Sequence, residues 1–125
     1  EDGAAAADED SRAGEALVTR AIDYLQATLD EEVDLDDIAA AAGVSRRTLV
    51  RHFRQRRGIA PMTLRRRLRL QRAHESLLAG DPESLRIVDV ACRWGFYNLG
   101  HFAVLYRRVF DCSPSQTLRR RGSGV

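Results

Sequence analysis

Residues 35–53, LDDIAAAAGVSRRTLVRHF, decide the fold of this chain, and residues 87–106, IVDVACRWGFYNLGHFAVLY, repeat their pattern. Each copy has a short apolar segment with an early Asp, then a glycine, Gly43 or Gly95, and then a polar residue that can cap a helix. Two large apolar residues follow that cap at four and eight positions, so they share one helix face. Two short helices joined by a glycine turn are typical of a helix-turn-helix unit. The repeat therefore predicts two such units.

Helical periodicity continues on both sides of the repeat, and no segment alternates apolar and polar residues as a strand would. We predict an all-α fold of about seven helices, in which two helix-turn-helix subdomains are joined by a long linker helix. The expected helices cover residues 15–30, 35–42, 46–57, 61–79, 84–94, 98–110 and a short segment from 113 onwards. The expected domains are an acidic disordered linker at 1–14, a first subdomain at 15–60, the linker helix at 61–80 and a second subdomain at 81–125.

Capping and stop signals mark the ends of these helices. Four side chains that can accept a hydrogen bond from a free first-turn amide precede the apolar segments: Asp34, Ser45, Ser84 and Asn98. Gly43 can adopt the left-handed conformation that ends a helix. Residues 1–14 are small or acidic without an apolar period, so we expect them to be disordered, and we expect residues 119–125 to fray.

The charges divide the chain into an acidic and a basic part. Residues 1–43 hold thirteen Asp or Glu and two Arg, whereas residues 44–125 hold eighteen Arg and five Asp or Glu. A polycation attracts phosphate backbones because counterions are released on binding. All 20 basic residues are Arg, whose guanidinium can donate two parallel hydrogen bonds to a phosphate or a guanine. The charge distribution favours a nucleic-acid partner.

The predicted helix after Ser45 has an apolar and a basic face. At about 100° per residue, Leu49 and Phe53 fall together. Four arginines and a valine lie on the remaining face and are the candidate DNA-binding residues of the first unit: Arg46, Arg47, Val50, Arg51 and Arg54. A recognition helix needs this arrangement, because it packs on a core with one face and contacts the major groove with the other.

The predicted helix after Asn98 repeats the apolar anchor with Phe102 and Tyr106 but carries fewer hydrogen-bond donors. The candidate DNA-binding residues of the second unit are Asn98, Gly100, His101, Val104 and Arg107. We expect the first recognition helix to supply most of the hydrogen-bonded specificity and the second to contribute phosphate and van der Waals contacts. The linker helix, roughly 27 Å long, could set the two recognition helices about one DNA turn apart, so that a monomer would contact two successive major grooves.

The second unit carries the more specific motif. Its residues are Ile87, Asp89, Val90, Ala91, Trp94-Gly95-Phe96, Phe102, Tyr106-Arg107-Arg108, Phe110 and Ser113-Pro114. The matching residues of the first unit and the linker are Phe53, Gly58, Pro61 and 68–73. Through these residues the chain resembles, over about residues 17–120, the DNA-binding domain of the AraC/XylS family of bacterial transcription regulators.

The resemblance implies a two-lobed fold of seven helices that binds double-stranded DNA through both recognition helices. By position, it implies base contacts from Arg46, Arg47, Val50, Arg51, Gly100, His101 and Val104. It also implies a separate effector or dimerisation domain, which is expected but absent from this chain. Asp111 departs from the family pattern, in which Gly is common, and Asp adopts the left-handed conformation at some cost.

Two alternative functions remain open at this point. A helical module of a DNA-alkylation repair methyltransferase would need a reactive cysteine, and neither Cys92 nor Cys112 has a supporting motif. A module that contacts RNA polymerase would bind duplex DNA without salt dependence, or not at all. The sequence has no catalytic, zinc-binding or cofactor motif, so we expect no enzyme, metal or cofactor. With no export signal and no apolar run of membrane length, we expect a cytoplasmic protein without membrane contact.

Overall fold

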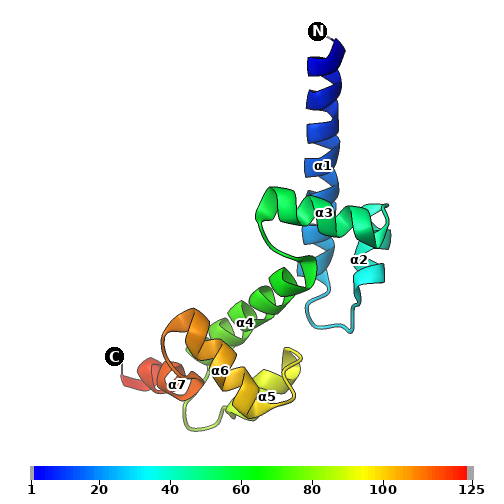
Figure 1. The fold of residues 1–125 in the computed structure, drawn as a ribbon. Helices are drawn as coiled ribbons and strands as arrows, with labels where there is room; N and C mark the ends of the chain where they lie inside the picture. Colours follow the sequence, from blue (N-terminus) through cyan, green and yellow to red (C-terminus); the bar gives the residue numbers. More distant parts are fainter. Residues whose placement is uncertain (1, 124–125) are drawn as a thin grey trace. The chain divides into compact units, whose positions relative to one another are not determined.

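The computed structural model describes the backbone of residues 2–123 and the side chains of residues 9–120, and within these bounds it contains seven helices and no strand (Figure 1). The helices are α1 (Asp2–Ala27), α2 (Leu35–Ala42), α3 (Arg46–Arg57), α4 (Pro61–Ala79), α5 (Ile87–Arg93), α6 (Leu99–Phe110) and α7 (Pro114–Ser123). The predicted all-α fold is therefore confirmed. The chain divides into two compact units, Glu1–Arg66 and Arg67–Val125, so the division falls within α4.

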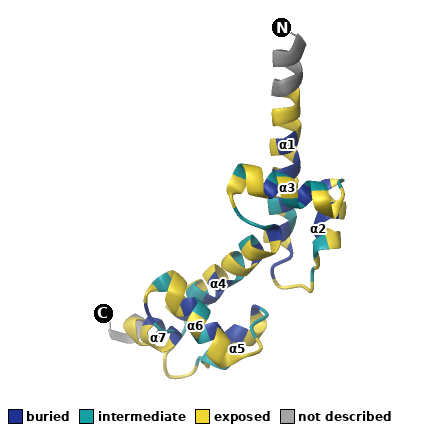
Figure 2. Ribbon diagram, in the orientation of Figure 1, coloured by how far each residue is buried: buried dark blue, intermediate teal, exposed yellow. Residues whose placement is uncertain are grey.

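Unit 1 forms where α2 and α3 pack against the second half of α1 (Figure 2). Five large side chains of its core have no exposed surface: Val18, Leu25, Ile38, Leu49 and Phe53. Each such burial contributes about 1.5–3 kcal/mol relative to an exposed side chain. The anchor predicted for the first recognition helix thus lies in the core, which fixes the rotation of α3 about its own axis.

The start of α1 corrects two predictions. We expected a helix from residue 15 and disorder before it, but α1 begins at Asp2; residue 1 lies outside the described part. Alanine has the highest helix propensity, and extending an existing helix avoids the cost of nucleation, so an apolar period is not needed there. Gly14 is buried, and a Cβ at this position would require the guanidinium of Arg56 to move.

Arg65 connects the amino end of α4 to the turn that directly follows α1, inside unit 1. Its side chain is nearly buried, and Nη2 donates to the carbonyl oxygens of Thr28, at 3.5 Å, and Glu31. Cations are favourable beside the last carbonyls of a helix. This arginine of the linker helix therefore has a structural role and is not part of the exposed basic surface.

Unit 2 closes around Tyr106, which has no exposed surface. Its hydroxyl donates to Thr117 Oγ1 at 2.8 Å and lies 2.6 Å from Nδ1 of His74. The His74 ring stacks on Phe110, with 4.1 Å between ring centroids and 8° between the planes. A buried tyrosine hydroxyl needs such polar partners, and these join α4, α6 and α7.

The start of α5 differs from the prediction. We expected Ser84 to cap this helix, but α5 begins at Ile87, and Arg86 precedes it without a side-chain cap. The amides of Ser84 and Leu85 instead donate to the carbonyl oxygen of Asp81, at 3.1 and 2.8 Å. These hydrogen bonds hold Ser84 and Leu85 in the turn after α4, so α5 begins after that turn and not at Ser84.

The carboxyl end also differs, since α7 extends to Ser123 where we expected fraying from residue 119; residues 124–125 lie outside the described part. Ser113 and Gln116 cap the start of α7 reciprocally, with hydrogen bonds of 2.8 and 3.1 Å between backbone amides and side-chain oxygens. Thr117 and Leu118 of α7 are buried within unit 2. A cap and a buried face stabilise a helix that propensity alone does not predict.

Asp111, the carboxyl cap of α6, has a φ of 61° and is the one described non-glycine residue with positive φ. We expect Asp111→Gly to raise the free energy of unfolding by about 1 kcal/mol, because glycine adopts this conformation without strain. Gly43→Ala is the matched control: its φ is 75° and nothing lies within 4 Å of an added Cβ, so it should lower stability by strain alone. Urea denaturation measures both, and a destabilised Asp111→Gly protein would contradict the prediction.

Burial lowers the pKa of His74, and the charge of Glu75 opposes this in part. In the unfolded chain His74 takes up a proton below about pH 6.5, whereas in the folded chain it stays neutral to lower pH. Stability should therefore fall as the pH drops below this value. We expect the free energy of unfolding to decrease more between pH 7 and pH 5 for the wild type than for His74→Asn. Parallel profiles in urea titrations at each pH would contradict this.

Candidate nucleic-acid interface

The turn of each helix-turn-helix unit has the same backbone hydrogen bond. Gly43 and Gly95 have φ values of 75° and 87°, a conformation that suits glycine because it lacks Cβ. The amide after each glycine donates to the carbonyl five residues earlier, from Val44 to Ala39 at 3.1 Å and from Phe96 to Ala91 at 2.8 Å. The duplication predicted from the sequence is present in both units.

Both recognition helices begin at predicted caps. Ser45 Oγ accepts from the amide of Thr48 at 3.2 Å, and Asn98 Oδ1 accepts from the amide of His101 at 2.9 Å. Asp34 caps α2 and forms a reciprocal pair with Asp37. The three caps are confirmed, and they fix the residue at which each helix begins.

The outer face of α3 is basic and has few partners within the molecule. Arg47, Arg51 and Arg54 are exposed, and none of them forms an ion pair or side-chain hydrogen bond with another residue in the described part of the chain. Arg46 is exposed too, but its Nε lies 3.4 Å from Asp36 Oδ1. Such a surface pair contributes at most about 1 kcal/mol, so a phosphate could replace it. Val50 is half-buried beside this face.

Two arginines in the last turn of α3 contact α1 and do not belong to the free basic face. Arg56 and Arg57 both pair with Glu15 of α1, and the Arg56 Nη1 to Glu15 Oε2 distance is 3.9 Å. The hydrogen bond from Arg57 lowers the pKa of the Glu15 carboxyl, and the charges of Arg57 and Arg56 lower it further. These two arginines hold α1 and α3 together, so the basic face of α3 is not uniform.

The outer face of α6 carries fewer charged side chains than that of α3. Phe102 and Tyr106 are fully buried, as the anchor prediction requires. Of the predicted contact residues, Asn98, Gly100, His101 and Arg107 are exposed, and Val104 is 50% exposed. The five candidates of this unit are therefore all exposed along α6 and its cap.

Aligning the two helices at their caps shows which positions point most directly away from the anchors. At about 100° per residue these are the second, sixth and tenth helical residues. In α3 they are Arg47, Arg51 and Gln55; in α6 they are Gly100, Val104 and Arg108. We name these two rows the α3 ridge and the α6 ridge. Gln55 and Arg108 were not predicted as DNA-binding residues, although the same helical spacing carried one turn further includes both.

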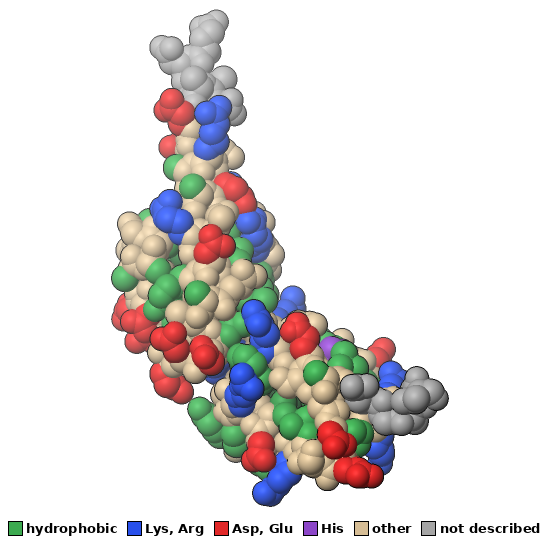
Figure 3. Space-filling model, turned by 180° about the vertical axis from the view of Figure 1, so that it is seen from behind, with side chains coloured by type: hydrophobic (Ala, Val, Ile, Leu, Met, Phe, Trp, Pro, Cys, Tyr) green, Lys and Arg blue, Asp and Glu red, His purple; other side chains and the backbone are tan. Residues whose placement is uncertain are grey.

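Acidic side chains gather around the connection between α1 and α2 (Figure 3). Asp36 and Asp37 lie in the first turn of α2, where the helix dipole favours anions. Part of the acidic run near residues 30–37 therefore stabilises the start of α2.

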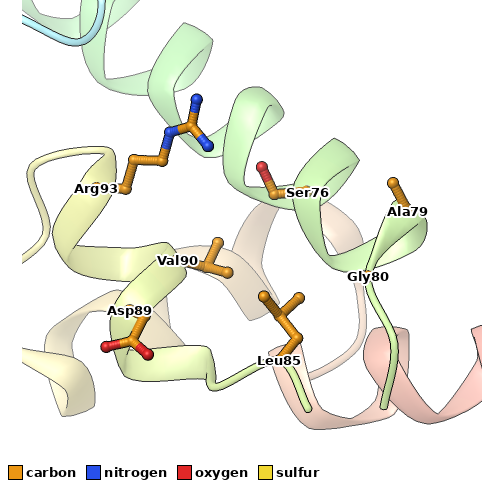
Figure 4. A pocket seen from close by; sticks show the side chains of 7 residues that line it. All are labelled: Ser76, Ala79, Gly80, Leu85, Asp89, Val90 and Arg93. Carbon is orange, nitrogen blue, oxygen red and sulfur yellow. The ribbon is translucent and has the colours of Figure 1, made fainter. Parts of the chain in front are cut away.

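Unit 2 also contains a pocket of about 390 Å³ between the end of α4 and α5 (Figure 4). Its lining residues are Ser76, Ala79, Gly80, Leu85, Asp89, Val90 and Arg93. Neither Cys92 nor Cys112 lines it, and no residue of α6 does. The pocket is thus separate from the candidate recognition face of α6.

Within the described part of the chain, no cluster of three His, Cys, Asp or Glu side chains could hold a metal ion. No helix among the described residues is long and apolar enough to cross a membrane.

Two units of this kind, each with a capped and exposed second helix, define a helix-turn-helix DNA-binding fold. The family model described as a helix-turn-helix domain matches residues 38–120. The probable thc operon regulatory protein of Rhodococcus erythropolis is 38% identical over 103 residues, which are 82% of this chain and 31% of that protein. An AraC-type transcriptional regulator from Chromobacterium violaceum has a crystal structure with 33% identity and a TM-score of 0.79, covering 89% of this chain and 96% of that one.

The DNA-binding domain of AdpA, solved in complex with a target DNA, is 28% identical with a TM-score of 0.72, and the match covers 85% of this chain and 94% of that one. The chain belongs to the AraC-type helix-turn-helix family. It spans about a third of the length of the curated relatives it matches.

Arg51 and Arg57 form a matched pair for testing the interface, since both lie on α3 but only Arg57 pairs with Glu15. We expect Arg51→Ala to weaken binding to a cognate duplex by about 1–3 kcal/mol, the contribution of a bidentate base contact. Arg57→Ala should change affinity little and reduce thermal stability instead. Fluorescence anisotropy and thermal melting measure the two effects, and equal losses of affinity would contradict this assignment.

Proposed function

We propose that this domain binds specific sequences in double-stranded DNA to regulate transcription, with α3 and α6 in successive major grooves. The observation that carries the proposal is the α3 face: Arg47, Arg51 and Arg54 are exposed, lack partners among the described residues and lie opposite a fully buried anchor. Guanidinium groups in this setting can donate to guanine O6 and N7 or to phosphate oxygens.

The two helices would share recognition unequally. The α3 ridge carries two arginines and a glutamine, whereas the α6 ridge carries a glycine and a valine before its arginine. We assign most hydrogen-bonded base contacts to Arg46, Arg47, Arg51 and Arg54, with Val50 beside them. Asn98, His101 and Arg107 are assigned to phosphates and the edge of the groove, because phosphate contacts position a helix without requiring a particular base.

Partners of the whole protein belong to the same proposal. Since the matched relatives are about three times as long as the matched segment, we propose a separate effector or dimerisation domain. A regulator that binds DNA at a promoter lies beside RNA polymerase, so we also propose that the whole protein contacts the polymerase there. The proposed location is the bacterial cytoplasm, where chromosomal DNA lies.

Footprinting and salt titration test this function together. We expect duplexes selected from a random pool to show two protected stretches about 10 base pairs apart on one face of the helix. Affinity should fall about a hundredfold between 50 and 200 mM salt, the loss expected for roughly four phosphate contacts. A single protected stretch would contradict the use of both helices. Salt-insensitive binding, or none, would favour a protein-interaction module instead.

A further inference from the structure

The α6 ridge presents no hydrogen-bonding side chain in its first two turns. Gly100 and Val104 occupy the positions held in the α3 ridge by Arg47 and Arg51. Both residues are exposed, and half of the surface of Val104 (50%) is accessible to solvent. A helix that meets a major groove with this ridge has to distinguish bases by shape and apolar contact.

Gly100 has no role in the fold that requires a glycine. Its φ is not among the positive values, which occur at Gly43, Gly58 and Gly95. A Cβ added to it would meet only Asn98 Oδ1, at 3.5 Å, an ordinary contact. Glycine within a helix is less stable than alanine, so the fold alone would favour alanine here. The missing side chain instead lets another surface approach the α6 backbone closely.

Val104 lies one turn further along the same ridge and would follow the backbone toward the floor of the groove. Among the groups that base pairs expose in the major groove, the C5-methyl of thymine is the apolar one. We propose that Val104 contacts the C5-methyl of a thymine, and that Gly100 permits the close approach of α6 that this contact needs. This rests on the proposed placement of α6 in a major groove.

The consequence is a bound sequence with two different halves. The half under α3 should contain guanines that pair with Arg47 or Arg51, and the half under α6 should contain at least one required thymine. Replacing that thymine by deoxyuridine removes the methyl group alone and keeps the O4 acceptor. When the thymines of the selected α6 half are replaced one at a time, we expect roughly fourfold weaker binding, as for one buried carbon, at the thymine that Val104 contacts.

Val104→Ala and Val109→Ala form a matched pair of variants. Both valines are on α6 and both are 50% exposed, but they lie five residues apart, which turns Val109 about 140° away from Val104. With Val104→Ala, the thymine and deoxyuridine duplexes should bind equally. With Val109→Ala, the roughly fourfold preference for thymine should remain. A preference retained in Val104→Ala would overturn the assignment, because a contact shows itself as non-additivity.

Gly100→Ala tests the close approach with two readouts of opposite sign. Thermal melting should show an equal or higher transition temperature, since alanine favours the helix and has room. Affinity for the selected duplex should fall several-fold, because the new methyl holds α6 away from the groove. Unchanged or tighter binding by this variant would overturn the proposal.

Failure of the inference can be separated from failure of the proposed function. If the α6 half is protected in footprints but contains no thymine, or tolerates deoxyuridine throughout, the methyl contact is wrong while groove binding stands. If the α6 half is not protected at all, the placement of α6 in the groove is wrong, and this inference fails with it.

Discussion

Burial of two aromatic or aliphatic anchors per recognition helix is the constraint on which the rest of the structure depends. Leu49 and Phe53 in unit 1, and Phe102 and Tyr106 in unit 2, have no exposed surface. Rotating either helix would expose these side chains at about 1.5–3 kcal/mol each, so the rotation is fixed. The residues that face outward follow from this, and the outer ridges are determined by the core and not by their own chemistry.

The parts of the fold that could be predicted from the sequence are those set by interactions between residues close together in the chain. The caps at Asp34, Ser45 and Asn98 and the turn glycine Gly43 act within a few residues, so the starts of α2, α3 and α6 and the end of α2 follow from spacing. The start of α5 was mispredicted because Ser84 suits a turn as well as a cap. The extents of α1 and α7 depend on propensity and burial, which a search for apolar periods does not weigh.

Residue type and spacing predicted which residues belong to the candidate site. They did not predict which arginines form ion pairs or hydrogen bonds within the protein. Nothing in the sequence connects Glu15 to Arg56 and Arg57, about forty residues away, because ion pairs between distant segments arise only once helices pack. The same holds for Arg65, which lies in a run of similar arginines yet is nearly buried against the end of α1. Composition identified a basic surface, and only the fold separates its structural arginines from its free ones.

The exposed charge of α3 is carried by guanidinium groups alone, and the chain contains no lysine. Acetylation of lysine removes a positive charge and is one means of weakening nucleic-acid binding in cells. It has no side-chain target in this chain. Lysine acetylation therefore cannot weaken the attraction of this surface for phosphate.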